Sequence, residues 1–249
     1  MSGRTVIIAQ ARMSSTRLPG KTLMDLGGAP VLDRVVARAR RAALADDVWV
    51  AITDDPSDDV LETHLIGAGV PYVRGSLDDV LARYVLAADA ADAETVVRIT
   101  CDCPLIDPVC IDEVIAAFRE PEAVDYCSNT LVRTYPIGMD AEVFSREILE
   151  RAHVEATMQH EREHVTPYLY QHPERFRLRN VEAPEWALWP ELRLTVDEPA
   201  DLEMLREVVR LVGPDAGLAA ILAALQGEPE LVAINQRISH RHVSKPSAW

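Results

Sequence analysis

Three positively charged side chains lie within ten residues near the start of the chain. Arg12, Arg17 and Lys21 belong to the segment ARMSSTRLPGKTL (11–23), which also carries hydroxyl side chains and one glycine. A polyphosphate needs hydrogen-bond donors and positive charge in close quarters. The segment follows the apolar run TVIIAQ (5–10), and ligands of α/β proteins bind at the carboxyl ends of strands. A charged loop is also common as solvated surface, so charge alone leaves both interpretations open.

The tripeptide Gly20-Lys21-Thr22 resembles the end of a Walker phosphate-binding loop. That motif needs an earlier glycine, and in this chain Ser15 stands at its position. The strict pattern therefore fails, which argues against a kinase or NTPase of the P-loop type. The sequence also contains no GxGxxG pattern, which counts against a dinucleotide-binding Rossmann unit.

Two aspartates stand where a counter-ion for phosphates would be held. Asp102 follows the apolar run TVVRIT (95–100), and Asp197 follows the run RLTV (193–196). Each precedes a turn and a predicted helix, so both are expected at the carboxyl edge of the sheet. Mg²⁺ takes hard oxygen ligands, typically one or two carboxylates. The pair predicts a Mg²⁺ site, while Asp is equally familiar as a turn or helix N-cap residue.

The elements that must position these residues alternate regularly in the first half of the chain. Apolar runs predict strands at 5–10, 48–53, 72–75 and 95–100. Helical periodicity predicts helices at 30–44, 58–69, 78–91 and 109–119. The second half is less regular, with strands expected at 124–129, 139–145, 175–181 and 192–197, and helices at 145–156, 161–171, 201–212 and 216–226. Repeated strand–helix units indicate an α/β fold with a mainly parallel central sheet.

The composition bounds the class of protein. The 249 residues are 48% hydrophobic, which fits a single domain over 1–249. The net charge is 25 − 40 = −15, so a general nucleic-acid binder is not expected. No apolar run approaches the roughly 18 residues of a membrane span, and no signal peptide is visible.

The cysteines favour a reducing compartment. Cys101, Cys103, Cys110 and Cys127 have no framework spacing, so free thiols and a cytoplasmic location are expected. A redox or zinc protein using the Cys101-x-Cys103 pair is an alternative, but a second ligand pair at finger-like spacing is missing.

Several segments together resemble one family. The chain is similar to the cytidylyltransferases that activate acidic sugars, of the spore-coat polysaccharide, acylneuraminate and 3-deoxy-manno-octulosonate types. The segments that carry the resemblance are 11–23, 98–108, 135–145, 161–170 and 193–202. The resemblance implies the Rossmann-like nucleotide-diphospho-sugar transferase fold, with helices on both faces of the sheet and a small dimerisation and acceptor subregion. It further implies a nucleotide-binding half (1–123), an acceptor-binding and dimerisation half (124–212) and a C-terminal helix and tail (213–249).

The resemblance also implies roles for individual residues. Arg12, Arg17 and Lys21 match residues that hold a triphosphate, and Asp102 and Asp197 match the carboxylates that bind Mg²⁺. The expected catalytic set is Arg12, Lys21, Asp102 and Asp197. The expected nucleotide pocket adds Ala11, Ser15, Arg74, Gly75, Ser76 and Thr100. The expected acceptor pocket consists of Tyr135, Gly138, Asp140, Glu142 and His164.

The implied reaction joins CMP from CTP to an anionic small-molecule acceptor, with Mg²⁺ as cofactor and pyrophosphate as the second product. An acidic sugar of the nonulosonate or octulosonate kind is the expected acceptor, and a sugar phosphate or small phosphonate is the alternative. A non-catalytic nucleotide-binding protein on the same scaffold is a third interpretation. The resemblance also implies a homodimer.

Overall fold

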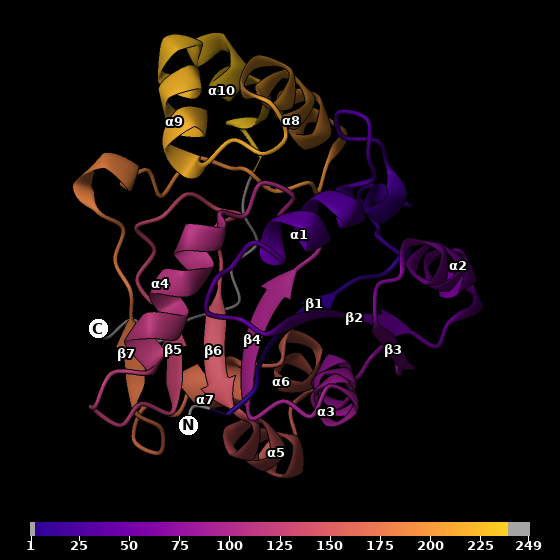
Figure 1. The fold of residues 1–249 in the computed structure, drawn as a ribbon, viewed down its shortest axis with the longest axis vertical. Helices are drawn as coiled ribbons and strands as arrows, with labels where there is room; N and C mark the ends of the chain where they lie inside the picture. Colours follow the sequence, from indigo (N-terminus) through magenta and orange to yellow (C-terminus); the bar gives the residue numbers. More distant parts are fainter. Residues whose placement is uncertain (1–2, 239–249) are drawn as a thin grey trace.

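The computed structural model describes residues 3–238, and a seven-stranded sheet runs through their centre (Figure 1). The strands lie in the order β3-β2-β1-β4-β6-β5-β7. Their bounds are β1 (Thr5–Gln10), β2 (Asp47–Thr53), β3 (Tyr72–Gly75), β4 (Thr95–Thr100), β5 (Tyr126–Ser128), β6 (Glu142–Ser145) and β7 (Leu178–Asn180). Of these seven, β6 runs antiparallel to both of its neighbours, and the remaining ladders are parallel. The mainly parallel sheet that the sequence predicts is confirmed.

The register of the central strands decides where the loops meet. Gln10, the last residue of β1, is paired with Ala51 on one side and with Thr100, the last residue of β4, on the other. The loops that follow β1 and β4 therefore start side by side. One of them carries the cation-rich segment 11–23 and the other carries Asp102.

Helices cover both faces of the sheet, as Figure 1 shows. One face packs against α1 (Val31–Ala39), α2 (Asp59–Ala68) and α4 (Pro108–Phe118). The other face packs against α3 (Val80–Ala90), α5 (Arg146–Glu155) and α7 (Pro167–Tyr170), and α6 (Gln159–His164) packs against α3. The central strands are apolar on both sides because each face is buried under a helical layer. Val6, Ile7, Ile8 and Ala9 of β1 are accordingly 0% exposed.

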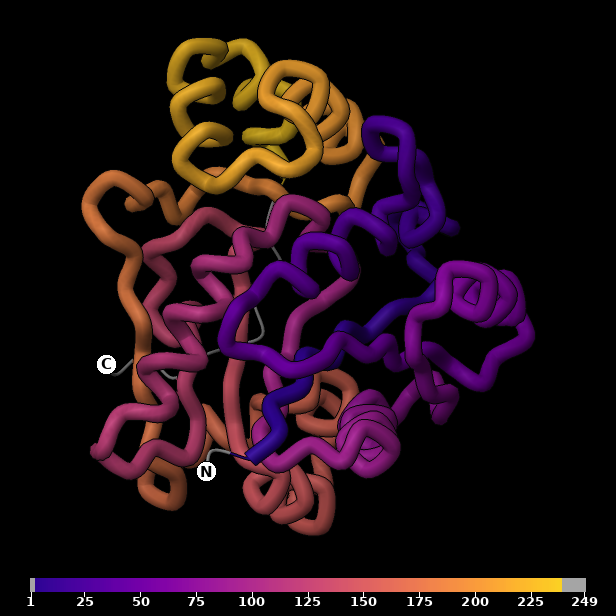
Figure 2. Tube along the Cα trace, viewed as in Figure 1, coloured from indigo at the N-terminus to yellow at the C-terminus, as the bar shows by residue number. Residues whose placement is uncertain are grey.

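A third apolar cluster joins the C-terminal helices to the rest of the molecule. These helices are α8 (Pro199–Val212), α9 (Leu218–Gly227) and α10 (Pro229–Asn235). They form the orange and yellow lobe at the top of Figure 2. The sequence predicts α8 and α9 and misses α10, and the predicted tail beyond residue 238 lies outside the described residues.

Two predicted elements differ from the observed ones. The strand expected at 192–197 forms only an isolated bridge, between Ile137 and Arg193, because no strand of the described part of the chain, residues 3–238, runs beside it. The helix expected at 161–171 is divided into α6 and α7 by Val165, whose φ of 72° is incompatible with a continuing helix. Pro167 then begins α7. Proline is favoured at the first position of a helix because the N–H group that it lacks would have no partner within the helix. Short 3₁₀ turns also occur at η1 (Lys21–Leu23), η2 (Pro56–Asp58) and η3 (Glu185–Ala187).

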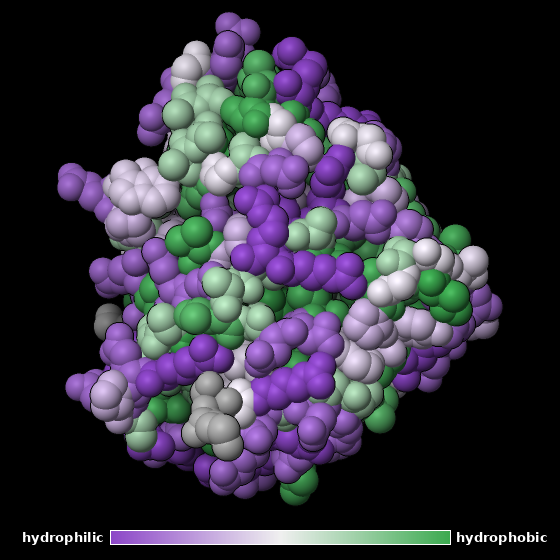
Figure 3. Space-filling model, in the orientation of Figure 1, coloured by the Kyte–Doolittle hydropathy of each residue, from purple (hydrophilic) through white to green (hydrophobic). Residues whose placement is uncertain are grey.

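Hydrophilic side chains surround smaller hydrophobic areas on the face shown in Figure 3, in keeping with the net charge of −15. Within residues 3–238, no helix combines the length and the apolar character that crossing a membrane requires.

Candidate active site

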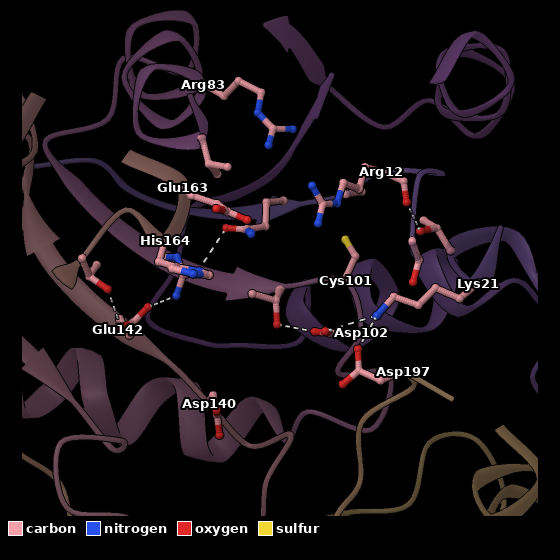
Figure 4. A pocket seen from close by; sticks show the side chains of 18 of the residues that line it. Arg12, Lys21, Arg83, Cys101, Asp102, Asp140, Glu142, Glu163, His164 and Asp197 are labelled. Atoms are coloured by element: carbon pink, nitrogen blue, oxygen red, sulfur yellow. Dashed lines mark hydrogen bonds and ion pairs between the residues drawn. The ribbon is translucent and has the colours of Figure 1, made fainter. Parts of the chain in front are cut away.

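A cavity of about 460 Å³ lies where the loops after β1 and β4 meet (Figure 4). Loops and helices of both halves of the chain line it. Eleven of the residues predicted from the sequence are among those that do so, namely Ala11, Arg12, Ser15, Arg17, Lys21, Thr100, Asp102, Asp140, Glu142, His164 and Asp197. The structure therefore brings together segments that are almost two hundred residues apart in the chain.

Local hydrogen bonds fix the cation-rich loop at the edge of the sheet. The Met13 N–H donates to Asp58 Oδ1 over 2.7 Å, and the Thr22 hydroxyl donates to the Arg12 carbonyl over 2.8 Å. Gly20 has a φ of 75°, a left-handed conformation that glycine adopts without strain. That turn starts η1 and directs Lys21 back toward the carboxyl ends of the strands.

Lys21 lies between the two predicted metal-binding acids. Its Nζ donates to Asp102 Oδ2 over 3.3 Å and to Asp197 Oδ1 over 2.8 Å, and also to the Val196 carbonyl over 2.7 Å. Burial alone would lower the pKa of Lys21, but the two carboxylates outweigh it and raise this pKa above its ordinary value. Burial likewise acts to raise the pKa of Asp102, and the charge of Lys21 and the Thr100 hydroxyl outweigh it and lower this pKa.

The second acid is held from behind by a buried network. Arg193, 3% exposed, donates from Nη2 to Asp197 Oδ2 over 2.5 Å. The fully buried Asp201 accepts the N–H groups of Asp197 and Glu198, each over 3.0 Å. Asn235 of α10 donates to Asp201 and to the Arg193 carbonyl. The C-terminal lobe therefore orients Asp197 so that its other oxygen faces Lys21.

The chemistry of this donor set fits a Mg²⁺ ion. Asp102 and Asp197 offer hard carboxylate oxygens that already converge on one positive charge, the Lys21 ammonium. Among residues 3–238, no group of three or more His, Cys, Asp or Glu side chains could form a complete cage. Mg²⁺ is usually held by one or two carboxylates with water and substrate phosphates as the remaining ligands, so two acids are the expected number.

The part of the cavity that is predicted to hold the acceptor, here called the acceptor half, contains two arginine–carboxylate pairs. Arg98 forms an ion pair with Glu142, and Glu142 Oε1 also accepts the hydroxyls of Tyr126 over 2.5 Å and Thr166 over 2.8 Å. Arg133 and Asp140 form a two-pronged pair, with both N–O distances at 2.7 Å. The carboxylates predicted to bind acceptor are thus already engaged with protein groups.

His164 stands beside these pairs in the cavity wall. Burial lowers its pKa below the ordinary value, and the nearby Arg98, His160 and Arg12 add to that effect against the opposing charge of Glu163. These surroundings therefore favour the neutral form of the imidazole.

Five predicted residues do not line this cavity. Arg74 turns away to Glu62 and Asp59, at 2.6 and 2.8 Å, and Ser76 accepts the Asp79 N–H. Gly75 packs against the stem of Arg83. In the structure Arg74, Gly75 and Ser76 shape the surroundings of β3, and their expected contact with the nucleotide stays a prediction.

Tyr135 and Gly138 also lie outside the lining of this cavity, and their surroundings give each of them a structural role. Tyr135 is 2% exposed and its hydroxyl donates to Glu113. Gly138 has a φ of 106°, and a Cβ placed there would lie 2.8 Å from the Leu194 carbonyl oxygen. Glycine is therefore required by the backbone at this position.

The sequence interpretation missed several polar residues of the cavity wall. They are Gln10, Thr22, Arg83, Arg98, Thr130, Arg133 and Thr166. The segment that contains Arg83 has the pattern of a core helix, and Val80, Leu81 and Tyr84 are indeed buried. An arginine among such apolar neighbours was an available signal, because a buried charge requires a partner or a ligand.

The four cysteines are free, as predicted, and all four are buried. Burial raises the pKa of the Cys127 thiol to about 12 and also raises those of Cys101, Cys103 and Cys110. Such thiols are poor nucleophiles and poor metal ligands at neutral pH, which disfavours the redox or zinc interpretation.

The family assignment follows from comparison of the whole sequence. Residues 6–226 match the family model described as Cytidylyltransferase. The match covers most of the 249 residues, so the chain belongs to the cytidylyltransferase family and is a nucleotidyltransferase.

Two relatives illustrate the range of similarity. The chain is 35% identical over 232 residues to the Spore coat polysaccharide biosynthesis protein SpsF of Bacillus subtilis (strain 168), covering 90% of this chain and 95% of that protein. It is 35% identical over 151 residues to the 3-deoxy-manno-octulosonate cytidylyltransferase of Chloroherpeton thalassium, covering 61% of this chain and 57% of the relative.

Solved structures confirm the Rossmann-like nucleotidyltransferase fold. A cytidylyltransferase from Leptospira borgpetersenii serovar Hardjo-bovis superposes with a TM-score of 0.88 at 29% identity, covering 97% of this chain and all of the other. A CMP:2-keto-3-deoxy-manno-octonic acid synthetase complexed with CTP shares the fold, with a TM-score of 0.65 at 21% identity over 84% of this chain and 99% of the other.

Proposed function

We propose that this protein is a Mg²⁺-dependent cytidylyltransferase that transfers CMP from CTP to an acidic sugar of the nonulosonate or octulosonate type. The observation that carries the proposal is the convergence of Lys21 with Asp102 and Asp197 in a cavity that Arg12 and Arg17 also line. The named activity of relatives such as the Chloroherpeton thalassium enzyme supports the choice of acceptor.

In this reaction an acceptor oxygen forms a bond to the α-phosphorus of CTP while the bond to the pyrophosphate oxygen breaks. Negative charge grows on the non-bridging oxygens and on the leaving group. Arg12 and Lys21 are the residues that would stabilise the departing pyrophosphate. Mg²⁺, when bound by Asp102 and Asp197, would neutralise phosphate charge. Catalysis then depends on positioning and electrostatics, without a covalent enzyme intermediate.

The acceptor decides whether proton transfer is needed. A sugar hydroxyl must lose its proton to become a good nucleophile, whereas a phosphate or phosphonate oxygen is already ionised. The neutral His164 and the carboxylate of Glu163 line the acceptor half and are able to receive a proton there. This arrangement favours a hydroxyl acceptor.

A sugar phosphate or small phosphonate is the second candidate acceptor. Two guanidinium groups, Arg98 and Arg133, line the acceptor half, and arginine suits phosphate geometry. Both are paired with carboxylates, which makes this candidate the weaker of the two.

Pyrophosphate release tests the proposal directly. The purified protein is incubated with CTP and Mg²⁺ and with a panel containing 3-deoxy-2-keto sugar acids, sugar phosphates and phosphonates. Release that depends on a sugar acid is expected, with the CMP-linked product confirmed by mass spectrometry. Release only with a phosphate or phosphonate would establish the second candidate, and binding of CTP without turnover on any acceptor would favour a non-catalytic role.

We also propose a homodimer in the cytoplasm. The predicted dimerisation half, 124–212, carries exposed apolar side chains, with Val154 81% and Met158 56% exposed, and the free thiols suit a reducing compartment. Light scattering coupled to size-exclusion chromatography distinguishes a dimer from the 27.6 kDa monomer.

A further inference from the structure

Two arginines of this protein are almost completely buried, and they differ sharply in how their donors are used. Arg38 of α1 is 1% exposed, and Arg83 of α3 is 2% exposed. Arg38 donates to three backbone carbonyls: Nε to Ile106 over 2.7 Å, Nη1 to Pro214 over 2.9 Å and Nη2 to Ala216 over 2.9 Å. These bonds tie α1 to the C-terminal lobe, so Arg38 has a sufficient structural explanation.

Arg83 lacks a comparable set of partners. Its Nη1 makes one long hydrogen bond, of 3.4 Å, to the Ala51 carbonyl, and its buried Nε has no hydrogen-bond partner among residues 3–238. It also takes part in no salt bridge within residues 3–238. Burying a charged group without pairing it is costly. The stability of the fold therefore does not explain the Arg83 guanidinium in the cavity wall, whereas binding of a ligand would.

The surroundings of Arg83 point to a ligand. The side chain lines the cavity beside Val80, and Figure 4 shows its guanidinium reaching from α3 toward the region that Arg12 also enters. Burial lowers the pKa of Arg83, and the positive charge of Arg12 acts in the same direction. Asp54 and Asp58 act in the opposite direction from a distance, but neither forms a salt bridge with Arg83 within residues 3–238. Two cations that face the same space attract negative charge to it.

A glycine makes this placement possible. A Cβ on Gly75, at the end of β3, would lie 2.9 Å from Arg83 Cγ and 3.0 Å from Leu86 Cδ1. Any larger residue at position 75 would therefore push the stem of Arg83 away from its present path. The close approach aligns Arg83 with the nucleotide-binding half of the cavity, whereas the acceptor half has its own paired arginines.

We propose that Arg83 is a nucleotide-binding residue whose guanidinium donates hydrogen bonds to an acceptor-only edge of CTP. Two parts of CTP have that chemistry, namely the phosphate oxygens and the O2–N3 edge of cytosine. The inference deepens the proposed function and rests on CTP being the substrate, but it does not depend on the acceptor.

The matched pair of buried arginines supplies the test. Affinity for CTP in the presence of Mg²⁺ is measured by calorimetry, and thermal stability is measured without ligand, for Arg83→Met and Arg38→Met. We expect Arg83→Met to bind CTP about 10- to 100-fold more weakly, the usual range for a lost charge-assisted hydrogen bond, while its Tm stays equal to or above that of the wild type. Arg38→Met should lower the Tm and leave the CTP affinity unchanged.

The opposite pattern for Arg83→Met, a lower Tm with wild-type affinity, would overturn the inference. If either methionine variant fails to fold, Arg83→Lys and Arg38→Lys replace the pair. Arg83→Lys keeps the charge but loses the planar fork, so a weaker affinity for CTP at wild-type Tm supports the inference and an unchanged affinity contradicts it.

Three probes identify the part of CTP that Arg83 contacts. If Arg83 contacts phosphate, Arg83→Met weakens the binding of CTP, UTP and inorganic tripolyphosphate by the same factor. If Arg83 contacts cytosine, only the binding of CTP becomes weaker. The preference for CTP over UTP is then lost, because uracil carries a hydrogen on N3. Unchanged binding of all three refutes the inference. A protein that needs Arg83 to bind CTP but transfers nothing to any acceptor would refute the proposed function alone.

Discussion

The predicted nucleotide side and the predicted acceptor side of the cavity use their charges in different ways. On the nucleotide side, Lys21 is shared by Asp102 and Asp197, and Arg17 pairs with Asp197 and Glu198. Arg12 and Arg83, in contrast, form no salt bridge within the described residues. On the acceptor side, Arg98 and Arg133 each have one carboxylate of their own, Glu142 and Asp140. Two guanidinium groups are therefore available to a ligand on the nucleotide side, whereas both arginines of the acceptor side are already paired.

The difference indicates what each half contributes. A triphosphate carries several negative charges, and cationic side chains that have no carboxylate partner in the protein strengthen its binding. On the acceptor side, burying the ion pairs costs desolvation energy, and the pairs hold their side chains in fixed positions. Fixed positions favour a ligand of matching shape. We infer that the nucleotide half provides most of the electrostatic stabilisation, whereas the acceptor half recognises its substrate by shape and directed hydrogen bonds.

The largest expected effect comes from the acids of the nucleotide side. Asp102→Ala or Asp197→Ala should abolish Mg²⁺-dependent pyrophosphate release, a loss of at least about a hundredfold, because each removes a stabilising contact to the transition state. Asp215→Ala is the control, since that carboxylate is 78% exposed and lies outside the cavity. Wild-type turnover in a folded Asp102→Ala or Asp197→Ala protein would remove the metal assignment.

A large effect on stability, not on nucleotide affinity, is expected from the acceptor side. Glu142→Ala leaves the Arg98 charge buried without its partner, which should lower the free energy of unfolding by about 3–5 kcal/mol in urea denaturation. Asp140→Ala should cost less, because that carboxylate is 30% exposed against 8% for Glu142. Equal costs for the two variants would show that the two pairs are not distinguished by burial.

The shared lysine predicts how divalent metal binds. Because the ammonium of Lys21 lies between both carboxylates, Mn²⁺, used as a paramagnetic substitute for Mg²⁺, should bind weakly until CTP draws Lys21 toward its phosphates. Lys21→Met should strengthen Mn²⁺ binding without CTP by about tenfold or more, since it removes a like charge at close range. Electron paramagnetic resonance of free Mn²⁺ measures this. Tight Mn²⁺ binding to the wild type without nucleotide would contradict the prediction.

Local sequence patterns were sufficient for the first half of the fold. The apolar run of β1 predicts a buried parallel strand at the observed bounds, and strand ends place Asp102 correctly at the cavity. The strand predicted at 192–197 was wrong. Its alternating apolar residues are buried, but Leu194 and Val196 pack against the C-terminal lobe and not in a sheet. An alternating apolar pattern indicates which residues are buried, but it does not indicate which element buries them.

The site was less predictable where partners come from distant elements. Arg74 was expected at the nucleotide, yet its partner Glu62 lies on α2, which no local motif indicates. Arg98 and Arg133 were missed because their carboxylates come from other segments of the chain. Their function depends on tertiary neighbours that spacing alone does not specify.

His164 gives the smallest and most specific test of the acceptor side. Its folded pKa is lowered by burial, so the native state binds fewer protons than the unfolded state once the pH falls below about 6.5. The contribution of this residue to stability is therefore complete above pH 6.5 and is lost as the pH falls through the folded pKa. His164→Gln, which stays neutral, should match the wild type at pH 8 and lose less stability between pH 6.5 and 5, by an amount smaller than the effects above. Parallel pH profiles for the two proteins would mean that the imidazole titrates as freely as in the unfolded chain, and the acceptor half would then be more hydrated than its buried ion pairs imply.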